Sequence, residues 1–129
     1  MIRRFEFTTG RGFRRPCLPV VLRYAGRSTP PHQMVLDTGS DRCMFDEQLA
    51  RDYLAFNPAT DGIIDSATGI SGSAPVAVFP VEIFIPDLSR SFQVHAQFKR
   101  LPFPGVLGFE GVLDQYTVTF HRGQYFEIS

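Results

Sequence analysis

Short apolar runs interrupted by Gly and Pro constrain the fold of this chain more than any other feature. Its 129 residues include 13 Phe, 11 Gly and 10 Pro, and no long stretch is rich in Ala, Leu, Glu and Lys. Phe and β-branched residues favour strands, whereas Gly and Pro favour turns. The sequence therefore predicts a mainly β protein with one or two short helices. A chain of this length builds one core, so we expect a single domain over residues 1–129.

Four segments carry the clearest strand pattern. The second of them ends directly on Asp37, which places this residue at a strand end. The third contains Pro80, which cannot donate to a strand ladder and must lie at an edge or a bulge. The fourth alternates apolar and polar residues, which predicts one buried face and one solvated face. The segments are residues 19–26, 33–36, 75–85 and 91–98.

Helical patterns are shorter and fewer. Residues 46–54 have apolar residues at helical spacing, with Asp46 as the candidate N-cap. A second short helical segment is predicted at residues 109–115. The chain then closes with a predicted hairpin at residues 117–128 that turns at Arg122-Gly123.

Charge and cysteine content exclude several classes of function. The 13 basic and 13 acidic residues balance, so no net charge favours nucleic acid or an anionic membrane surface. Five arginines in residues 1–15 mark either a basic arm or an ordinary solvated terminus. No apolar run has the length of a signal sequence core or a membrane span. Two cysteines, Cys17 and Cys43, are too few for a disulfide framework. We therefore expect a soluble, cytoplasmic protein with reduced thiols.

The segment Asp37-Thr38-Gly39-Ser40 is the strongest candidate for a chemical role. A carboxylate at a strand end is held rigidly if the chain turns sharply beneath it, and Gly39 permits that turn. The Thr38 hydroxyl can anchor the loop to neighbouring backbone, and Ser40 can donate to the carboxylate and favour its ionised form. Alone, the tripeptide is also consistent with an ordinary turn that closes a strand.

Two further elements, in the same order, make the chain resemble the retropepsins, the single-domain aspartic proteases of retroviruses and their cellular and bacterial relatives. In that family the catalytic motif follows an apolar strand, as it does in residues 34–39. The segment Gly69-Ile70-Ser71-Gly72 matches the tip of the flap hairpin, and Leu107-Gly108 matches an apolar-Gly signature near the C-terminus. Taken alone, these would be a surface turn and a packing glycine. The resemblance covers about residue 18 to the end and implies a closed acid-protease-type barrel with a flap.

The resemblance also implies a mechanism that needs two copies of the chain. Only one such motif is present, because the nearest second match, Asp65-Ser66-Ala67, lacks the glycine. Peptide hydrolysis of this kind uses two carboxylates, so a homodimer pairing Asp37 with its copy is implied, with water as nucleophile and no metal or organic cofactor. An extended peptide is the implied substrate. The implied catalytic residues are Asp37, Thr38 and Gly39, and the implied substrate-binding residues are Ser40, Asp41, Gly69, Ile70, Ser71, Gly72, Leu107 and Gly108.

Two departures from the family pattern leave alternatives open. Phe109 stands where the family has an Arg that supports Asp41. Arg14 or Arg15 of a second copy could replace that arginine, and Arg42 is a weaker candidate. The C-terminal hairpin is also longer than in the retroviral enzymes, which implies a differently built dimer interface. The alternatives are a catalytically inactive dimerisation or peptide-binding module of the same fold, and an unrelated small β-barrel binding domain.

The other reactive residues form no rival constellation. Cys43 has no neighbouring base in the sequence and is predicted to be a buried core residue. The three histidines are predicted to lie at the surface. Four apolar residues are candidates for substrate pockets. The histidines are His32, His95 and His121, and the pocket candidates are Ile70, Phe79, Phe103 and Phe109.

Overall fold

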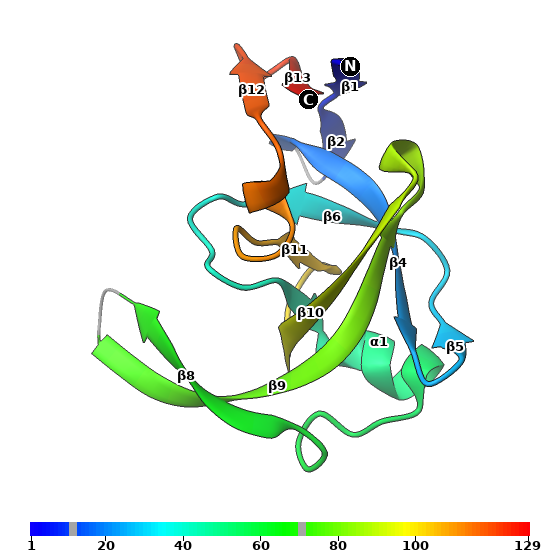
Figure 1. Cartoon of the computed structure of the whole chain (residues 1–129), viewed down its shortest axis with the longest axis vertical. Coiled ribbons are helices and arrows are strands. Elements are labelled where there is room, and N and C mark those ends of the chain that lie inside the picture. Colours follow the sequence, from blue (N-terminus) through cyan, green and yellow to red (C-terminus); the bar gives the residue numbers. More distant parts are fainter. Residues whose placement is uncertain (11–12, 70–71) are drawn as a thin grey trace.

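A closed barrel forms the centre of the computed structural model, which describes residues 1–10, 13–69 and 72–129 (Figure 1). Its main sheet has eight strands in the order β5-β4-β6-β11-β7-β10-β9-β8. Because β4 also pairs with β9, six of them (β4, β6, β11, β7, β10 and β9) close into a ring. The bounds are β4 Cys17–Tyr24, β5 Arg27–Ser28, β6 His32–Leu36, β7 Met44–Asp46, β8 Ile63–Gly69, β9 Gly72–Ile85, β10 Arg90–Lys99 and β11 Gly105–Leu107. The mainly β prediction and the predicted barrel are confirmed.

The barrel is filled by aliphatic and aromatic side chains from all six strands. Phe45, Phe79 and Ile83 are almost fully buried, and Phe79 stacks on Phe56 with ring centroids 4.6 Å apart. Along β10, apolar residues point inward and alternate with exposed residues, as predicted for residues 91–98. Burial of this apolar surface is the main term that stabilises the barrel.

Pro80 lies where β9 changes its partner. On one side β9 pairs with β10 along most of its length, with Pro80 opposite His95. On the other side β9 pairs with β8 up to Val78 and with β4 from Glu82 onward. Pro80 falls between these two partners, so its missing N–H breaks no ladder bond. The prediction of a local edge at this residue is confirmed.

A short helix follows β7. It consists of α1, Glu47–Leu49, and a π-helical turn, Ala50–Leu54. Asp46 precedes it as predicted, but the Asp46 side chain makes no cap hydrogen bond. Instead, Asp46 Oδ1 accepts the N–H of Leu101 at 3.2 Å, and the Asp46 N–H donates to the carbonyl of Pro104 at 2.9 Å. Asp46 is therefore the N-cap residue as predicted, but its carboxylate bonds to a tertiary partner and not to the helix, and Asp46 fastens the segment from Leu101 to Pro104.

Two 3₁₀ turns complete the helical structure: Pro86–Leu88 and Leu113–Gln115. The second replaces the longer helix predicted at residues 109–115. Gly111 has φ +83°, a left-handed conformation that interrupts a right-handed helix. Only the last three residues of the predicted segment are therefore helical. In the part of the chain that the structure describes, no helix is long and apolar enough to cross a membrane.

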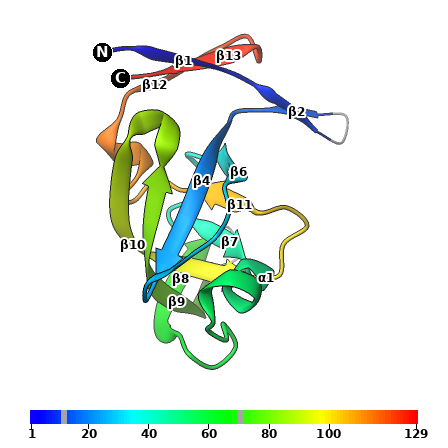
Figure 2. The ribbon, with the colours of Figure 1, turned by 90° about the vertical axis from the view of Figure 1, so that its right-hand side faces the viewer.

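A second, three-stranded sheet lies over one end of the barrel (Figure 2). Its order is β1-β13-β12, with β1 Arg3–Glu6, β12 Val118–His121 and β13 Tyr125–Ile128. Arg122 and Gly123, at φ +53° and +68°, form the turn between β12 and β13. Two consecutive left-handed residues give the turn twist that suits a hairpin, so the predicted hairpin is confirmed. We call these three strands the terminal sheet.

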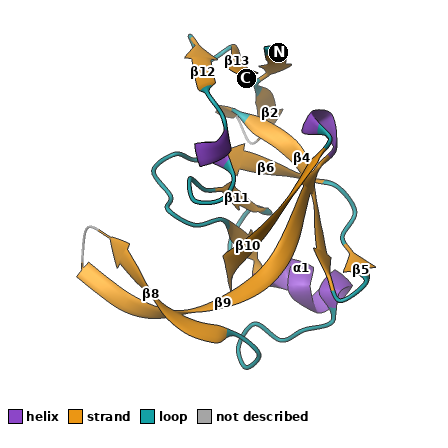
Figure 3. Ribbon diagram, in the orientation of Figure 1, coloured by secondary structure: helices purple, strands orange, loops and turns teal. Residues whose placement is uncertain are grey.

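The N-terminal arginines belong to strands. Arg3 and Arg4 lie in β1, which pairs with β13. Arg14 and Arg15 lie in β3, Phe13–Arg15, which pairs with β2, Thr8–Gly10. Figure 3 shows how little of the chain is helical and how the terminal sheet connects to the barrel through β2 and β4 at one end of the molecule.

Candidate active site

Asp37 lies directly after β6, on a backbone that the neighbouring strand holds in place. β6 runs parallel to β11, with Val106 opposite Val35. The Asp37 N–H donates to the carbonyl of Leu107 at 3.1 Å, which extends this pairing by one residue. The Asp37 side chain is nevertheless exposed. The carboxylate is therefore presented to solvent from a fixed backbone position, which a catalytic group requires.

A tight turn after Asp37 directs a donor at its carboxylate. The Gly39 N–H donates to Asp37 Oδ1 at 3.0 Å, and the Ser40 N–H donates to the Asp37 carbonyl at 3.2 Å. A Cβ on residue 39 would lie 3.3 Å from Asp37 Oδ1, so a side chain there would crowd the carboxylate. Thr38 is exposed beside it.

Ser40 has a different partner from the one predicted. Its hydroxyl donates to the Arg42 carbonyl at 2.7 Å and not to the Asp37 carboxylate. Ser40 is half-buried, and its hydroxyl is directed to a carbonyl of its own loop. Ser40 therefore shapes the loop that follows Asp37 and leaves the carboxylate open to solvent.

The segment after β11 crosses this loop at very close range. The N–H groups of Phe109 and Glu110 donate to the carbonyls of Ser40 at 2.8 Å and Asp41 at 2.9 Å. A Cβ on Gly108 would lie 2.3 Å from the Arg42 carbonyl oxygen, a distance that no side chain tolerates without backbone movement. Gly108 is thus required by the crossing of two backbones, and the crossing fixes the Asp37 loop from below.

Cys43 is part of this crossing and is chemically quiet. It is 1% exposed, and its Sγ accepts the N–H of Gly108 at 3.3 Å. Burial raises the pKa of Cys43 to about 11, and the Gly108 hydrogen bond opposes the rise. The thiol therefore stays protonated near neutral pH and is not a nucleophile, as predicted. Cys17 is also free and buried, and burial raises its pKa against the opposing charge of Arg15.

The other predicted substrate-binding residues divide into three groups. Asp41 is exposed in the loop after Asp37. Leu107 is 0% exposed, so we expect it to position Asp37 through its carbonyl and not to touch a substrate. Gly69 pairs with Gly72 at the end of the β8–β9 hairpin, which projects from the barrel (Figure 1). Ile70 and Ser71, between them, lie outside the described residues.

A mainly apolar cavity of about 350 Å³ lies beside β6. Gln33 and Val35 of β6 line it, and Val35 stands two residues before Asp37. Phe103 lines it as predicted, whereas Phe79 is a buried core residue and was wrongly predicted for a pocket. Apart from Phe103, the lining residues were not predicted from the sequence to form a pocket. The sequence signal that could have indicated this cavity is the Pro-Phe-Pro segment just before β11. The lining residues are Thr8, Arg15, Cys17, Gln33, Val35, Pro102, Phe103 and Pro104.

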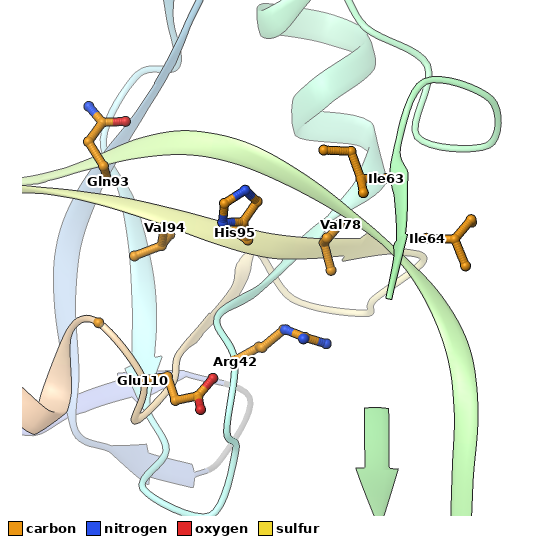
Figure 4. A pocket seen from close by; sticks show the side chains of 9 residues that line it. Arg42, Ile63, Ile64, Val78, Gln93, Val94, His95 and Glu110 are labelled. Carbon is orange, nitrogen blue, oxygen red and sulfur yellow. The ribbon is translucent and has the colours of Figure 1, made fainter. Parts of the chain in front are cut away.

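A second cavity of about 410 Å³ lies at the other end of the Asp37 loop (Figure 4). Arg42 and Glu110 line it from the two crossing segments, and Ile63 and Ile64 of β8 line it from the base of the projecting hairpin. Both isoleucines are more than half exposed. The apolar cavity therefore contains residues of the strand that precedes the Asp37 loop. The second cavity, which we call the mixed cavity because polar and apolar side chains line it, contains Arg42 at the end of this loop.

The arginines considered as partners for Asp41 are spread over this surface. Arg14 donates through Nη2 to the Gln124 carbonyl at 3.4 Å. Arg15 lines the apolar cavity and Arg42 the mixed one. Phe109, which replaces the family arginine, is 47% exposed. At the position where the resemblance to retropepsins implies an arginine, the side chain is thus exposed and apolar.

The histidines lie apart from one another. His95 is exposed on β10, as predicted. His32 is half-buried, with Nδ1 2.8 Å from the Pro30 carbonyl. His121 is half-buried and stacks on Tyr125, and its Nε2 lies 3.4 Å from Glu127 Oε1 without the alignment of a hydrogen bond. For these two, the prediction of a surface position was only partly right.

Comparison with known proteins agrees with this geometry at the level of fold. No family model matches the sequence. No curated protein matches it either. Among solved structures, the chain is similar to the crystal structure of a retropepsin-like aspartic protease from Rickettsia conorii, with a TM-score of 0.65 and 13% sequence identity. The match covers 99% of this chain and 91% of that one. The chain therefore has a retropepsin-like fold.

Proposed function

We propose that this chain is an aspartic endopeptidase that acts as a homodimer. One observation carries the proposal: within a retropepsin-like fold, an exposed Asp37 carboxylate stands on a backbone fixed by Leu107 and receives the Gly39 N–H. A carboxylate that served only to close a turn would not need Gly108, where a second backbone segment crosses the same loop too closely for a side chain.

Two copies of Asp37 supply the chemistry. In a two-fold dimer the carboxylates face each other, and like charges at such range share one proton. The ionised member takes a proton from water, which attacks the peptide carbonyl carbon. The protonated member gives its proton to the carbonyl oxygen, so that a tetrahedral intermediate forms. In each copy the Gly39 N–H holds Oδ1 of its own carboxylate in position by a hydrogen bond of 3.0 Å.

The proposed substrate is an extended peptide with an apolar side chain beside the cleaved bond. The cavity that contains Phe103 also contains Val35, two residues before Asp37, and is lined mainly by apolar groups. Its volume of about 350 Å³ accommodates a large apolar side chain. The hairpin of β8 and β9 then covers the peptide from the opposite side, as the flap does in the retropepsins.

A second candidate function is a peptide-binding module of the same fold without catalysis. The observation that favours it is Phe109, which is 47% exposed where the retropepsins have an arginine. An exposed aromatic side chain suits binding of an apolar peptide, whereas a lost arginine weakens the support of Asp41. Both functions keep an extended peptide as the ligand, so an activity measurement separates them.

Cleavage of a peptide library by the Asp37→Asn variant tests the proposal. Asn keeps an oxygen that accepts the Gly39 N–H, so the fold should persist, while cleavage should fall at least about 100-fold because acid–base catalysis is lost. Asp52→Asn, on the exposed face of the helix, is the matched control and should retain activity. Unchanged cleavage by Asp37→Asn would refute the proposal. Peptide binding without cleavage by the wild type would favour the binding module.

A further inference from the structure

All three strands of the terminal sheet come from one chain, and its two outer strands have open edges. β13 lies in the centre and pairs with β1 on one side and β12 on the other. Neither outer strand has a further partner among the described residues. An open strand edge presents unpaired N–H and C=O groups and is a template for pairing with another chain.

The hydrogen bonds of the hairpin show which groups of β12 face its open edge. Thr117 and Ser129 exchange both backbone hydrogen bonds, at 2.9 and 3.0 Å. In an antiparallel pair such residues alternate with residues whose polar groups point away from the partner. The N–H and C=O groups of Val118 and Phe120 therefore point away from β13, toward the open edge.

The open edge of β12 lies on the side of the molecule that carries the candidate site. In Figure 1, β6 points to the left and ends directly before Asp37, and the β8–β9 hairpin projects to the same side. β12 is the leftmost strand of the terminal sheet in that view, and β1 lies on the far side of β13. A two-fold axis beside β12 would therefore lie on the same side of the molecule as the end of β6.

We propose that two copies pair edge to edge through β12, antiparallel about a two-fold axis at Thr119, to form a continuous six-stranded sheet. This inference rests on the proposed function, since it names the contact that brings the two Asp37 carboxylates together. Val118 of each copy then stands opposite Phe120 of the other, and four backbone hydrogen bonds form between them. The order of the sheet becomes β1-β13-β12 followed by β12-β13-β1 of the second copy.

Other centres for the two-fold axis satisfy fewer groups. An axis at Val118 would place Tyr116 opposite Phe120, but the Tyr116 N–H already donates to the Leu113 carbonyl at 3.1 Å. An axis at Phe120 would place Arg122 opposite Val118, but Arg122 has φ +53° and belongs to the turn. Only the axis at Thr119 pairs every outward N–H and C=O group of β12.

The side chains of β12 are complementary under this pairing. On the face toward the barrel, the branched Val118 meets Phe120, which is 45% exposed in the single chain. On the outer face, Thr119 meets its own copy and Thr117 meets His121. Aromatic pairs with β-branched residues and Thr pairs stabilise neighbouring strands, and no like charges face each other.

The open edge of β1 has the character of an edge that remains in solvent. β1 carries the exposed Arg3, Arg4 and Glu6, and charged residues of this kind protect edges from pairing. β12 carries no Lys, Arg, Asp or Glu. This contrast makes β1 the internal control for any test of β12.

A disulfide test distinguishes the two edges. In the proposed register, Thr119 and its copy form a non-hydrogen-bonded pair with Cα atoms about 4.5 Å apart, within the range of a disulfide. We expect Thr119→Cys to give a covalent dimer in non-reducing electrophoresis after mild oxidation at micromolar concentration. Glu6→Cys, an exposed site on β1, should remain mostly monomeric. The native cysteines are buried and should give little background.

A second pair of variants tests the backbone contact. Phe120→Pro removes the outward N–H, whereas Phe120→Thr removes the ring but keeps that N–H. Sedimentation should show a dimer dissociation constant at least about 10-fold higher for the proline variant than for the threonine variant. Circular dichroism of both variants checks that the single chain still folds, so a loss of dimer is assigned to the edge.

The outcomes separate this interface from the proposed function. A wild-type dimer whose Thr119→Cys variant does not cross-link would overturn the β12 interface and leave the endopeptidase proposal standing. Efficient cross-linking at Thr119 with no peptide cleavage by the wild type would support the interface and refute the enzyme. A chain that stays monomeric at high micromolar concentration would overturn both.

Discussion

The Asp37 loop and the terminal sheet are held by different means. In the loop, backbone groups bond to backbone groups, and Gly108 lets two segments cross at a distance that excludes a side chain. In the terminal sheet, aromatic rings pack together, with Phe126 contacting three others. A crossing that excludes a side chain leaves the two backbones no room for one, whereas the terminal sheet adds buried aromatic surface to its backbone ladders. The difference teaches that the Asp37 loop depends on a glycine at one position, and that the terminal sheet depends on a buried aromatic anchor.

The largest effect is expected where the terminal sheet joins the core. Phe126 is 0% exposed, so Phe126→Ala should lower the free energy of unfolding by about 3–5 kcal/mol, measured by urea denaturation. Phe120, at 45% exposure, is the matched control, and Phe120→Ala should cost roughly 1 kcal/mol. Equal losses would contradict the assignment of the buried ring as the anchor of the sheet.

A somewhat smaller effect is expected at the crossing. Gly108→Ala forces a Cβ against the Arg42 carbonyl and should lower the free energy of unfolding by about 3 kcal/mol. Gly26→Ala tests the contribution of backbone conformation alone, because Gly26 has φ +79° with no atom within 4 Å of its Cβ position. That control should lose about 1 kcal/mol. If both variants lose the same stability, the close crossing is not what requires glycine.

The third prediction concerns pH. The pKa of Cys43 is about 11 in the folded chain, raised mainly by burial from 9.0. Between these values the unfolded chain loses the proton first, so stability present below pH 9 falls as pH rises toward 11. Cys43→Ala should remove this component, which is on the order of 2 kcal/mol. The difference between the wild-type and variant unfolding curves at pH 8 and pH 11 measures it, and a constant difference would contradict the prediction.

The smallest effect is expected at Ser40. Its hydroxyl donates to the Arg42 carbonyl at 2.7 Å, so Ser40→Ala should cost about 1 kcal/mol of stability. Ser89, an exposed serine whose bond to the Pro86 carbonyl is 3.5 Å long, is the control and should cost nearly nothing. Peptide cleavage should fall modestly in Ser40→Ala. A fall as large as that of Asp37→Asn would mean that Ser40 acts on the carboxylate after all.

The sequence predicted the elements whose signals are local. Alternation along residues 91–98, the apolar run before Asp37 and the turn at Arg122-Gly123 each reflect a constraint within a few residues, and each is present in the structure. The glycine at residue 108 was also singled out, although its physical reason, the Arg42 carbonyl beside it, appears only in three dimensions.

The partners of polar side chains could not be predicted in the same way. Asp46 matched an N-cap pattern but bonds to Leu101, 55 residues away. Ser40 was predicted to serve the carboxylate but bonds to the Arg42 carbonyl. Polar side chains choose among several geometrically possible partners, and the choice depends on which backbone groups the fold leaves unpaired.

Asp46 has a consequence for how this protein can diversify. It fastens the segment from Leu101 to Pro104 at both ends, while Phe103 between them lines the cavity that also contains Val35. Proline on either side of Phe103 further limits the backbone. The backbone on both sides of residue 103 is therefore held in place. A substitution of this side chain changes the shape of the cavity and leaves the loop folded. Such an arrangement separates ligand preference from folding, so new preferences are reachable by single substitutions.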